Sequence, residues 1–186
     1  MKANCCRTST RCSEKTKLHV DKDTVQCLAL PIVGGQILIP SAVVAEVYAM
    51  DAVFPATGGP DWLLGNIIWR GSELPLVCME AALGAPGLEA GVRSKAVVMK
   101  AQSASEMLKH FAVLVQGIPH QVLATGHSVA PEIAIDGPRP FVAMDLQVEG
   151  EQAFIPDMDA VEKALLDAVD QWRAREPAGS DGDDFS

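Results

Sequence analysis

Short apolar runs separated by turn residues make up most of the chain from Thr24 onward. Five runs lie in the first half, over residues 25–32, 36–39, 43–50, 62–69 and 74–79. Gly34-Gly35 separates the first two runs, and a glycine pair in this position favours a tight hairpin turn. Arg70-Gly71-Ser72-Glu73 separates the last two runs and predicts a second hairpin.

The second half of the chain repeats this pattern. Its apolar runs cover residues 95–100, 111–115, 118–125, 141–148 and 152–155. Gln116-Gly117 and Glu149-Gly150-Glu151 mark turns between neighbouring runs. About ten short strands, with no helical pattern between consecutive strands, favour closed or nearly closed β-barrels over a parallel sheet.

Both ends of the chain differ from the β pattern. Residues 1–23 are polar without a sustained period, which predicts a flexible N-terminal arm. Residues 157–172 repeat apolar side chains at three- and four-residue steps, so we expect a helix there, capped by Asp157 or Asp159. Residues 173–186 are rich in Gly, Ser and Asp and predict an acidic disordered tail.

Composition narrows the class of protein. The chain has 186 residues, 48% of them hydrophobic, which is enough for one domain, whether simple or built of two packed halves. The apolar runs fall far short of the roughly 20 residues of a membrane helix, and the N-terminus lacks the apolar stretch of a secretory signal. Five cysteines are an odd number without a disulfide framework. We therefore expect a cytoplasmic protein with free thiols and no membrane insertion.

The charge balance argues against one class of partner. Lysine and arginine total 15 against 24 aspartate and glutamate residues, giving a net charge of −9. The resulting field repels phosphate backbones and anionic lipid surfaces. Nucleic acid is therefore not an expected partner.

Few side chains suggest catalysis. Cys78 with His120 or His127 is the pairing inside the expected fold that would allow a small cysteine-dependent hydrolase. A second alternative, a regulatory module that binds a small ligand between its barrels, would leave no trace in the sequence. Neither glycine-rich phosphate loops nor a cleft-forming carboxylate pair stands out, so we expect no cofactor.

The N-terminal arm holds four residues of the types that bind metals well. These residues are Cys5, Cys6, Cys12 and His19. They lack the Cys-x-x-Cys spacing of a zinc site, and adjacent cysteines rarely chelate one ion. We therefore expect no metal site in this arm.

Two segments give the most specific signal in the chain. They are Val43-Val44-Ala45-Glu46-Val47 and the stretch from Gly65 to Val77, which contains Arg70-Gly71. In this order they resemble the signature of CheW-like coupling domains from bacterial chemotaxis. The run 26–30 and the strand ending in Ile39-Pro40 also resemble the first hairpin of that family.

The resemblance implies a mainly all-β fold, with two packed five-stranded SH3-like β-barrels and a C-terminal helix. It covers residues 24–172, with the first barrel at about 24–83, the second at about 92–156 and the closing helix at 157–172. It also implies a protein without enzyme activity. Such domains bridge the cytoplasmic tip of a methyl-accepting chemotaxis receptor to a CheA-type histidine kinase.

By the same resemblance, Val44, Glu46, Gly65, Arg70 and Gly71 border the receptor-binding surface. Gly71 sits at a hairpin corner where a positive φ suits glycine, and Gly65 allows a close backbone approach. Arg70 offers five donors to a partner helix, although it could equally tie its own loop. Glu46 shares a face with Val44 if the strand is regular, although it could equally be an ordinary solvent-facing residue.

The chain also departs from the family pattern. An acidic residue is common after the Arg-Gly hairpin and after the apolar strand of the second barrel. Here those regions read Val77-Cys78-Met79-Glu80 and Val115-Gln116-Gly117-Ile118-Pro119. Since charge often selects partners, this departure suggests an accessory coupling protein of a pilus-linked, twitching-motility system.

Overall fold

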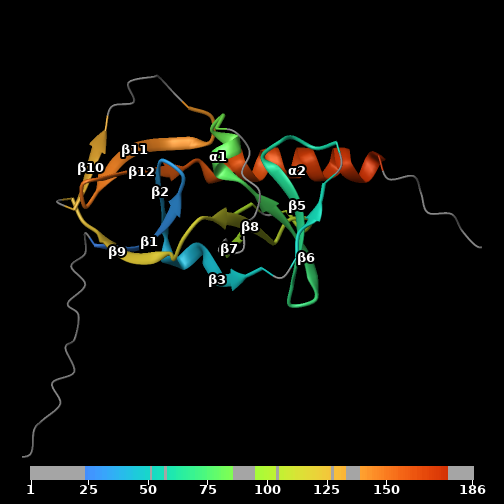
Figure 1. Ribbon diagram of the computed structural model, residues 1–186, viewed down its shortest axis with the longest axis horizontal. Coiled ribbons are helices and arrows are strands. Elements are labelled where there is room, and N and C mark those ends of the chain that lie inside the picture. The colour runs from blue at the N-terminus through green and yellow to red at the C-terminus, as the bar shows by residue number, and fades with distance from the viewer. Residues whose placement is uncertain are drawn as a thin grey trace, which may run out of the picture.

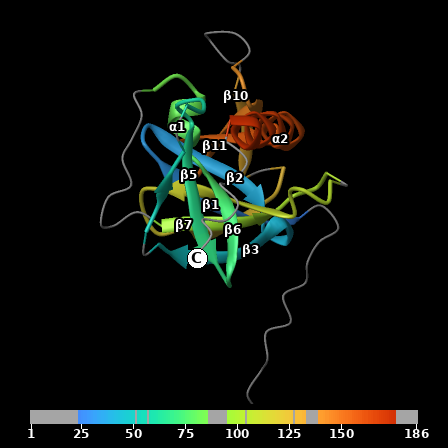
Figure 2. The same cartoon turned by 90° about the vertical axis from the view of Figure 1, so that its right-hand side faces the viewer.

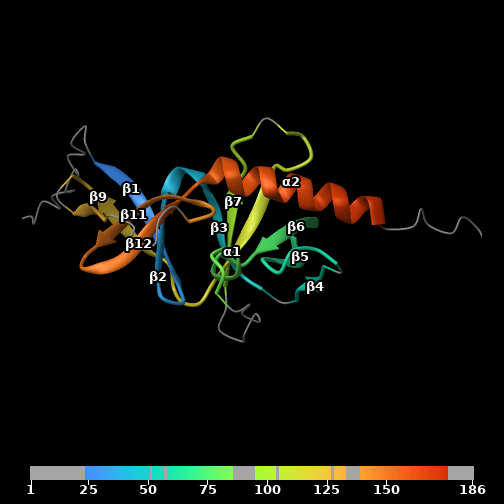
Figure 3. The same cartoon turned by 90° about the horizontal axis from the view of Figure 1, so that it is seen from above.

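The computed structural model describes residues 24–50, 52–56, 58–85, 95–103, 105–126, 128–132 and 139–175. These residues form two six-stranded sheets that lie at opposite ends of the long axis of the molecule (Figures 1 and 3). Helix α2 (Met158–Arg175) starts beside one sheet and runs along the other. Figure 2 looks nearly along this helix. No helix in the described part of the chain has the length and apolar character needed to cross a membrane.

We call the two sheets A and B. Sheet A contains β1 (Val25–Ile32), β2 (Gly35–Pro40), β9 (His120–Ala124), β10 (Val129–Glu132), β11 (Val142–Val148) and β12 (Glu151–Pro156), in the order β10-β11-β12-β2-β1-β9. Sheet B contains β3 (Val44–Ala49), β4 (Phe54–Pro55), β5 (Leu63–Trp69), β6 (Ser72–Val77), β7 (Lys95–Lys100) and β8 (His110–Val115), in the order β3-β7-β8-β6-β5-β4. Two short helices, η1 (Ser41–Val43) and α1 (Met79–Ala82), follow β2 and β6.

Each sheet combines strands from both halves of the chain. In sheet A, β2 pairs in parallel with β12, and in sheet B, β6 pairs in parallel with β8. The expected division into barrels at about 24–83 and about 92–156 is therefore wrong. A hairpin pairs two strands that are neighbours in the sequence, so local turn residues predict it. Which hairpins come together in one sheet depends on pairing between strands that are distant in the sequence, and local residues do not predict that.

The expected β fold with a C-terminal helix is confirmed, with one more strand in each sheet. The additional strands are β4 and β10, which lie at the ends of their sheets. The strand β4 has two residues and lies between the apolar runs at 43–50 and 62–69. Edge strands this short carry almost no periodic signal in the sequence.

Three apolar clusters make up the core. One cluster lies within each sheet, around Leu146 in sheet A and Ile67 in sheet B. The third and largest is shared by both sheets and α2, and it includes Leu30, Phe111 and Leu165. Strands next to this shared cluster are buried on both faces, which explains why β8 reads as an unbroken apolar run rather than an alternating one.

A buried carboxylate links the two sheets. Glu80, in α1 at the end of β6, is 1% exposed. Its Oε1 accepts a hydrogen bond from the backbone N–H of Val33, at the β1–β2 turn, at 3.2 Å. Its Oε2 accepts one from Cys78 Sγ at 3.4 Å. The short helix α1 thus ties sheet B to sheet A. The sequence does not predict this helix, because the apolar run 74–79 predicts a strand up to Met79.

Helix α2 is longer than the expected 157–172 and begins one residue later. The expected cap at Asp157 is confirmed, because its Oδ1 accepts a hydrogen bond from Ala160 N at 3.0 Å. Val161 and Leu165 belong to the shared core. The helix therefore closes the gap between the sheets with its apolar face.

Candidate protein-binding site

The tip of the β5–β6 hairpin carries the most exposed of the predicted site residues. Trp69 pairs with Ser72, which leaves Arg70 and Gly71 as a two-residue turn. Their φ angles are 49° and 79°, both positive, as a type I′ turn requires. The positive φ predicted for Gly71 is confirmed. Arg70 also adopts the left-handed region, which costs a residue with a Cβ roughly 1 kcal/mol.

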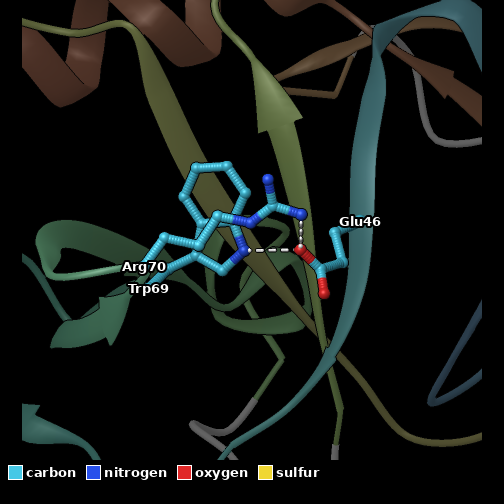
Figure 4. Close-up of polar contacts among 3 residues, drawn as sticks. All are labelled: Glu46, Trp69 and Arg70. Atoms are coloured by element: carbon cyan, nitrogen blue, oxygen red, sulfur yellow. Dashed lines mark hydrogen bonds and ion pairs between the residues drawn. The ribbon is translucent and has the colours of Figure 1, made fainter.

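Glu46 on β3 reaches this tip (Figure 4). Its Oε2 accepts a hydrogen bond from Trp69 Nε1 at 2.9 Å and another from Arg70 Nη2, also at 2.9 Å. The Arg70 guanidinium carbon lies 4.8 Å from the centroid of the Trp69 ring. We call Glu46, Trp69 and Arg70 the rim cluster.

The rim cluster joins two distant parts of sheet B. The strand β3 is at one end of its hydrogen-bonding order, and the β5–β6 hairpin lies towards the other end. Side chains, rather than a backbone ladder, thus connect these strands. The Arg70 side chain remains 70% exposed and that of Glu46 37% exposed. The guanidinium therefore faces solvent while one of its nitrogens is held.

The environment of Glu46 favours its ionised form. The hydrogen bond from Trp69 lowers the pKa of Glu46 most, followed by the hydrogen bond and the positive charge of Arg70. A carboxylate accepts both bonds better than a neutral acid does. The pair therefore presents a fixed negative oxygen beside an exposed cation.

Val44 lies apart from Glu46. A register shift in the β3–β7 ladder falls between the two residues. Val44 packs against the core shared with α2, whereas Trp69, the partner of Glu46, packs against the cluster inside sheet B. A regular strand is the condition for Val44 and Glu46 to share a face, and this condition is not met, because a bulge breaks the two-residue alternation between them.

Gly65 is buried beside β4, where it pairs with Pro55. Its φ is 139°, and a Cβ at this position would lie 2.0 Å from the backbone oxygen of Phe54. The close backbone approach predicted for this glycine is confirmed. Of the predicted site residues, Glu46 and Arg70 thus meet directly and Gly71 completes the turn, whereas Val44 lies against the core shared with α2 and Gly65 against β4.

Trp69 was not among the predicted site residues. It ends the apolar run 62–69, where nothing in the sequence distinguishes a site residue from a core side chain. The available signal was weak: an aromatic residue directly before an Arg-Gly turn. Its contact with Glu46, 23 residues earlier in the chain, depends on tertiary structure.

The cysteine–histidine alternative gains no support from the structure. Cys78 is 0% exposed inside sheet B and donates to Glu80. His120 lies exposed on β9 in sheet A, and His127 is outside the described residues. The buried thiol and the exposed imidazole thus belong to different sheets, whereas a nucleophile and its base must lie within hydrogen-bond reach of each other.

The structure also bears on the ligand and metal alternatives. A cavity beneath α2 is lined by apolar side chains, among them Met79, Met99 and Met158, and lacks polar groups to orient a ligand. Within the described ranges, no three His, Cys, Asp or Glu residues are grouped closely enough to hold a metal ion. Cys5, Cys6, Cys12 and His19 lie outside those ranges.

Comparisons with known proteins found similar sequences and a similar fold. Residues 26–165 match the CheW-like domain. The chain is 26% identical over 145 residues to the chemotaxis protein CheW of Rhizobium meliloti (strain 1021), covering 77% of this chain and 90% of that protein. The crystal structure of the scaffolding protein TtCheW from Thermoanaerobacter tengcongensis aligns with a TM-score of 0.58 at 13% identity, covering 72% of this chain and 88% of that one. The structural match supports the fold of two packed SH3-like sheets.

Proposed function

Because the chain belongs to the family of CheW-like domains, we propose that it couples the cytoplasmic tip of a methyl-accepting chemotaxis receptor to a CheA-type histidine kinase. The family consists of non-catalytic scaffold proteins of chemotaxis. The proposal adds the two partners and a cytoplasmic location. It requires neither a cofactor nor a metal.

The observation that carries the proposal is the exposed Arg70 of the rim cluster. Its bond to Glu46 uses one terminal nitrogen, so most of the five N–H donors of the guanidinium face outward. A planar donor fork of this kind suits carboxylates and carbonyl oxygens on the surface of a partner helix. We assign Glu46, Arg70 and Gly71 to the exposed part of the proposed receptor surface, and Val44 and Gly65 to its border on the family resemblance alone.

We further propose that the protein is an accessory coupler in a pilus-linked, twitching-motility system. The support comes from the loop after β8, where Gln116, Gly117 and Ile118 contain no acidic residue. The acidic residue after the Arg-Gly hairpin, Glu80, is buried and bonded within the protein. A kinase contact that relies on either acid would therefore differ in this protein.

Co-sedimentation with receptor and kinase arrays tests the proposal. Arg70→Glu should weaken receptor association at least about tenfold, because interface arginines are frequent binding hot spots. The thermal midpoint should fall by less than about 3 °C, since an exposed ion pair contributes little stability. Lys163→Glu on α2, which is also exposed, makes the same charge change away from the rim and should bind normally.

Three outcomes would count against parts of this proposal. If the unaltered protein is not retained by receptor or kinase at micromolar concentrations, the adaptor role fails. If Arg70→Glu loses much of its folding stability, Arg70 is a structural residue that ties its own hairpin. If Lys163→Glu weakens binding equally, the effect belongs to net charge rather than to the rim.

A further inference from the structure

Trp69 contacts both charged members of the rim cluster. Its Nε1–H donates to Glu46 Oε2 at 2.9 Å, and its ring lies under the Arg70 guanidinium at 4.8 Å. Consecutive residues of a regular strand point to opposite faces. Here Arg70 is already in the turn, with φ of 49°, so its side chain can fold back over the ring of its neighbour.

Trp69 is itself firmly placed. It is half-buried and packs against the cluster inside sheet B. The ring of His110, at the start of β8, lies 5.1 Å away at an interplanar angle of 49°. The indole therefore has support from the core and from a neighbouring strand, which neither Glu46 nor Arg70 has.

An exposed ion pair without such support is a poor recognition element. Two long, solvated side chains exchange among many geometries, and holding one of them costs conformational entropy. An arginine in a left-handed turn has no intrinsic reason to point at β3. The indole N–H fixes the Glu46 carboxylate, and the indole ring supports the Arg70 guanidinium. Both side chains therefore lose conformational freedom before a partner binds.

We propose that Trp69 is a positioning residue that pre-orders Arg70 for its partner, by fixing Glu46 through the indole N–H and supporting the guanidinium on the ring. The inference rests on the proposed receptor-binding role of the rim cluster. It assigns Trp69 no direct contact with the partner. Its effect on affinity is therefore transmitted through Arg70.

Two substitutions separate the two contributions of the indole. Trp69→Phe keeps an aromatic surface but removes the N–H donor, and should weaken receptor binding by about three- to tenfold. Trp69→Leu removes both and should weaken it further. Trp62→Phe is the matched control, because Trp62 packs against Phe141 at a ring distance of 5.9 Å and takes no part in the rim cluster. It should bind with unchanged affinity.

A double-mutant cycle shows whether the effect passes through Arg70. Arg70→Ala should abolish most of the loss caused by Trp69→Phe, because the phenylalanine then has no guanidinium left to misplace. Full additivity of the two losses would overturn the proposal. So would a thermal midpoint of Trp69→Phe that falls enough to account for the lost binding by unfolding.

A measurement on the protein without any partner keeps the inference separate from the proposed function. The indole N–H resonance of Trp69, identified by its absence in Trp69→Phe, should shift in Glu46→Ala while the other tryptophan resonances stay unchanged. An unchanged Trp69 resonance would overturn the inference. If this shift is seen but the unaltered protein binds no receptor, the proposed function fails while the internal role of Trp69 stands.

Discussion

Gly65 and Gly71 belong to one hairpin but are glycine for different physical reasons. At Gly71, where φ is 79°, a Cβ would meet nothing within 4 Å. At Gly65 a Cβ would instead collide with the backbone of Phe54 and Pro55 at 2.0 to 2.8 Å. At Gly71 only the positive φ disfavours a side chain. At Gly65 a side chain would also collide with the backbone of β4.

This difference predicts unequal costs for the same substitution. Gly71→Ala should reduce the free energy of unfolding by about 1 kcal/mol, the usual cost of a left-handed residue. Gly65→Ala should reduce it by roughly 3 kcal/mol or more, because β4 must also move. Urea denaturation of both variants measures the two costs. Equal reductions in the free energy of unfolding would mean that displacing β4 costs no stability.

Glu46 gives the rim a predictable pH dependence. Its folded-state pKa is lowered, chiefly by the hydrogen bond from Trp69. The stability that the carboxylate contributes is therefore fully present above its ordinary pKa of about 4.3 and is lost as the pH falls through the lowered folded value. The difference in stability between the unaltered protein and Glu46→Gln should shrink over that acidic window. Thermal unfolding across a pH series measures it, and a difference that stays constant into acid would contradict the assignment.

The elements show where sequence patterns succeed and where they do not. Paired apolar runs around Gly34 and Arg70-Gly71 correctly predict the β1–β2 and β5–β6 hairpins, since the turn chemistry is local. The bulge between Val44 and Glu46 carries no such signal, because the run 43–50 is apolar at every position except Glu46 and so contains no alternation that a bulge could interrupt. The contact of Glu46 with Arg70 also spans 24 residues. The family resemblance predicts that Glu46 and Arg70 border one surface, but their spacing in the sequence does not predict that they contact each other.

Glu162 shows how an element can be held by a buried charge. On α2 and 1% exposed, it accepts hydrogen bonds from the backbone N–H groups of Gln102 and Ser103, both at 2.7 Å. These two residues follow β7. The carboxylate thus ties the end of a sheet B strand to the closing helix and satisfies two N–H groups there.

Removing this carboxylate should be costly. We expect Glu162→Ala to lose about 3 kcal/mol of unfolding free energy, because two charge-assisted bonds disappear and two backbone donors lose their partner. Lys163→Ala, an exposed neighbour on the same helix, should change stability by less than about 0.5 kcal/mol. Hydrogen exchange at Gln102 and Ser103 should accelerate in the first variant alone. Unchanged protection there would show that the loop is held by other contacts.

At the scale of the whole molecule, topology is what the sequence predicted least well. The apolar periodicity and the turn residues predict the strands and the closing helix. They do not predict that each sheet contains strands from both sides of the boundary expected near residues 83–92. Every link that unites the halves is a distant pairing: β1 with β9, β2 with β12, β3 with β7 and β6 with β8. Apolar periodicity reports which face of a strand is buried but not which strand lies beside it.

The observed topology predicts the behaviour of a divided chain. A cut between residues 88 and 89 interrupts no helix or strand in the described part of the chain. Neither fragment contains a complete sheet, because each sheet draws strands from both sides of the cut. Each fragment alone should therefore lack a cooperative thermal transition, since its strands lose their neighbours and the shared core loses one wall. Mixed or co-expressed fragments should associate and recover a single transition. Two sequential barrels would behave in the opposite way, with each fragment folding alone, so circular dichroism melting of the separate and mixed fragments distinguishes the two arrangements.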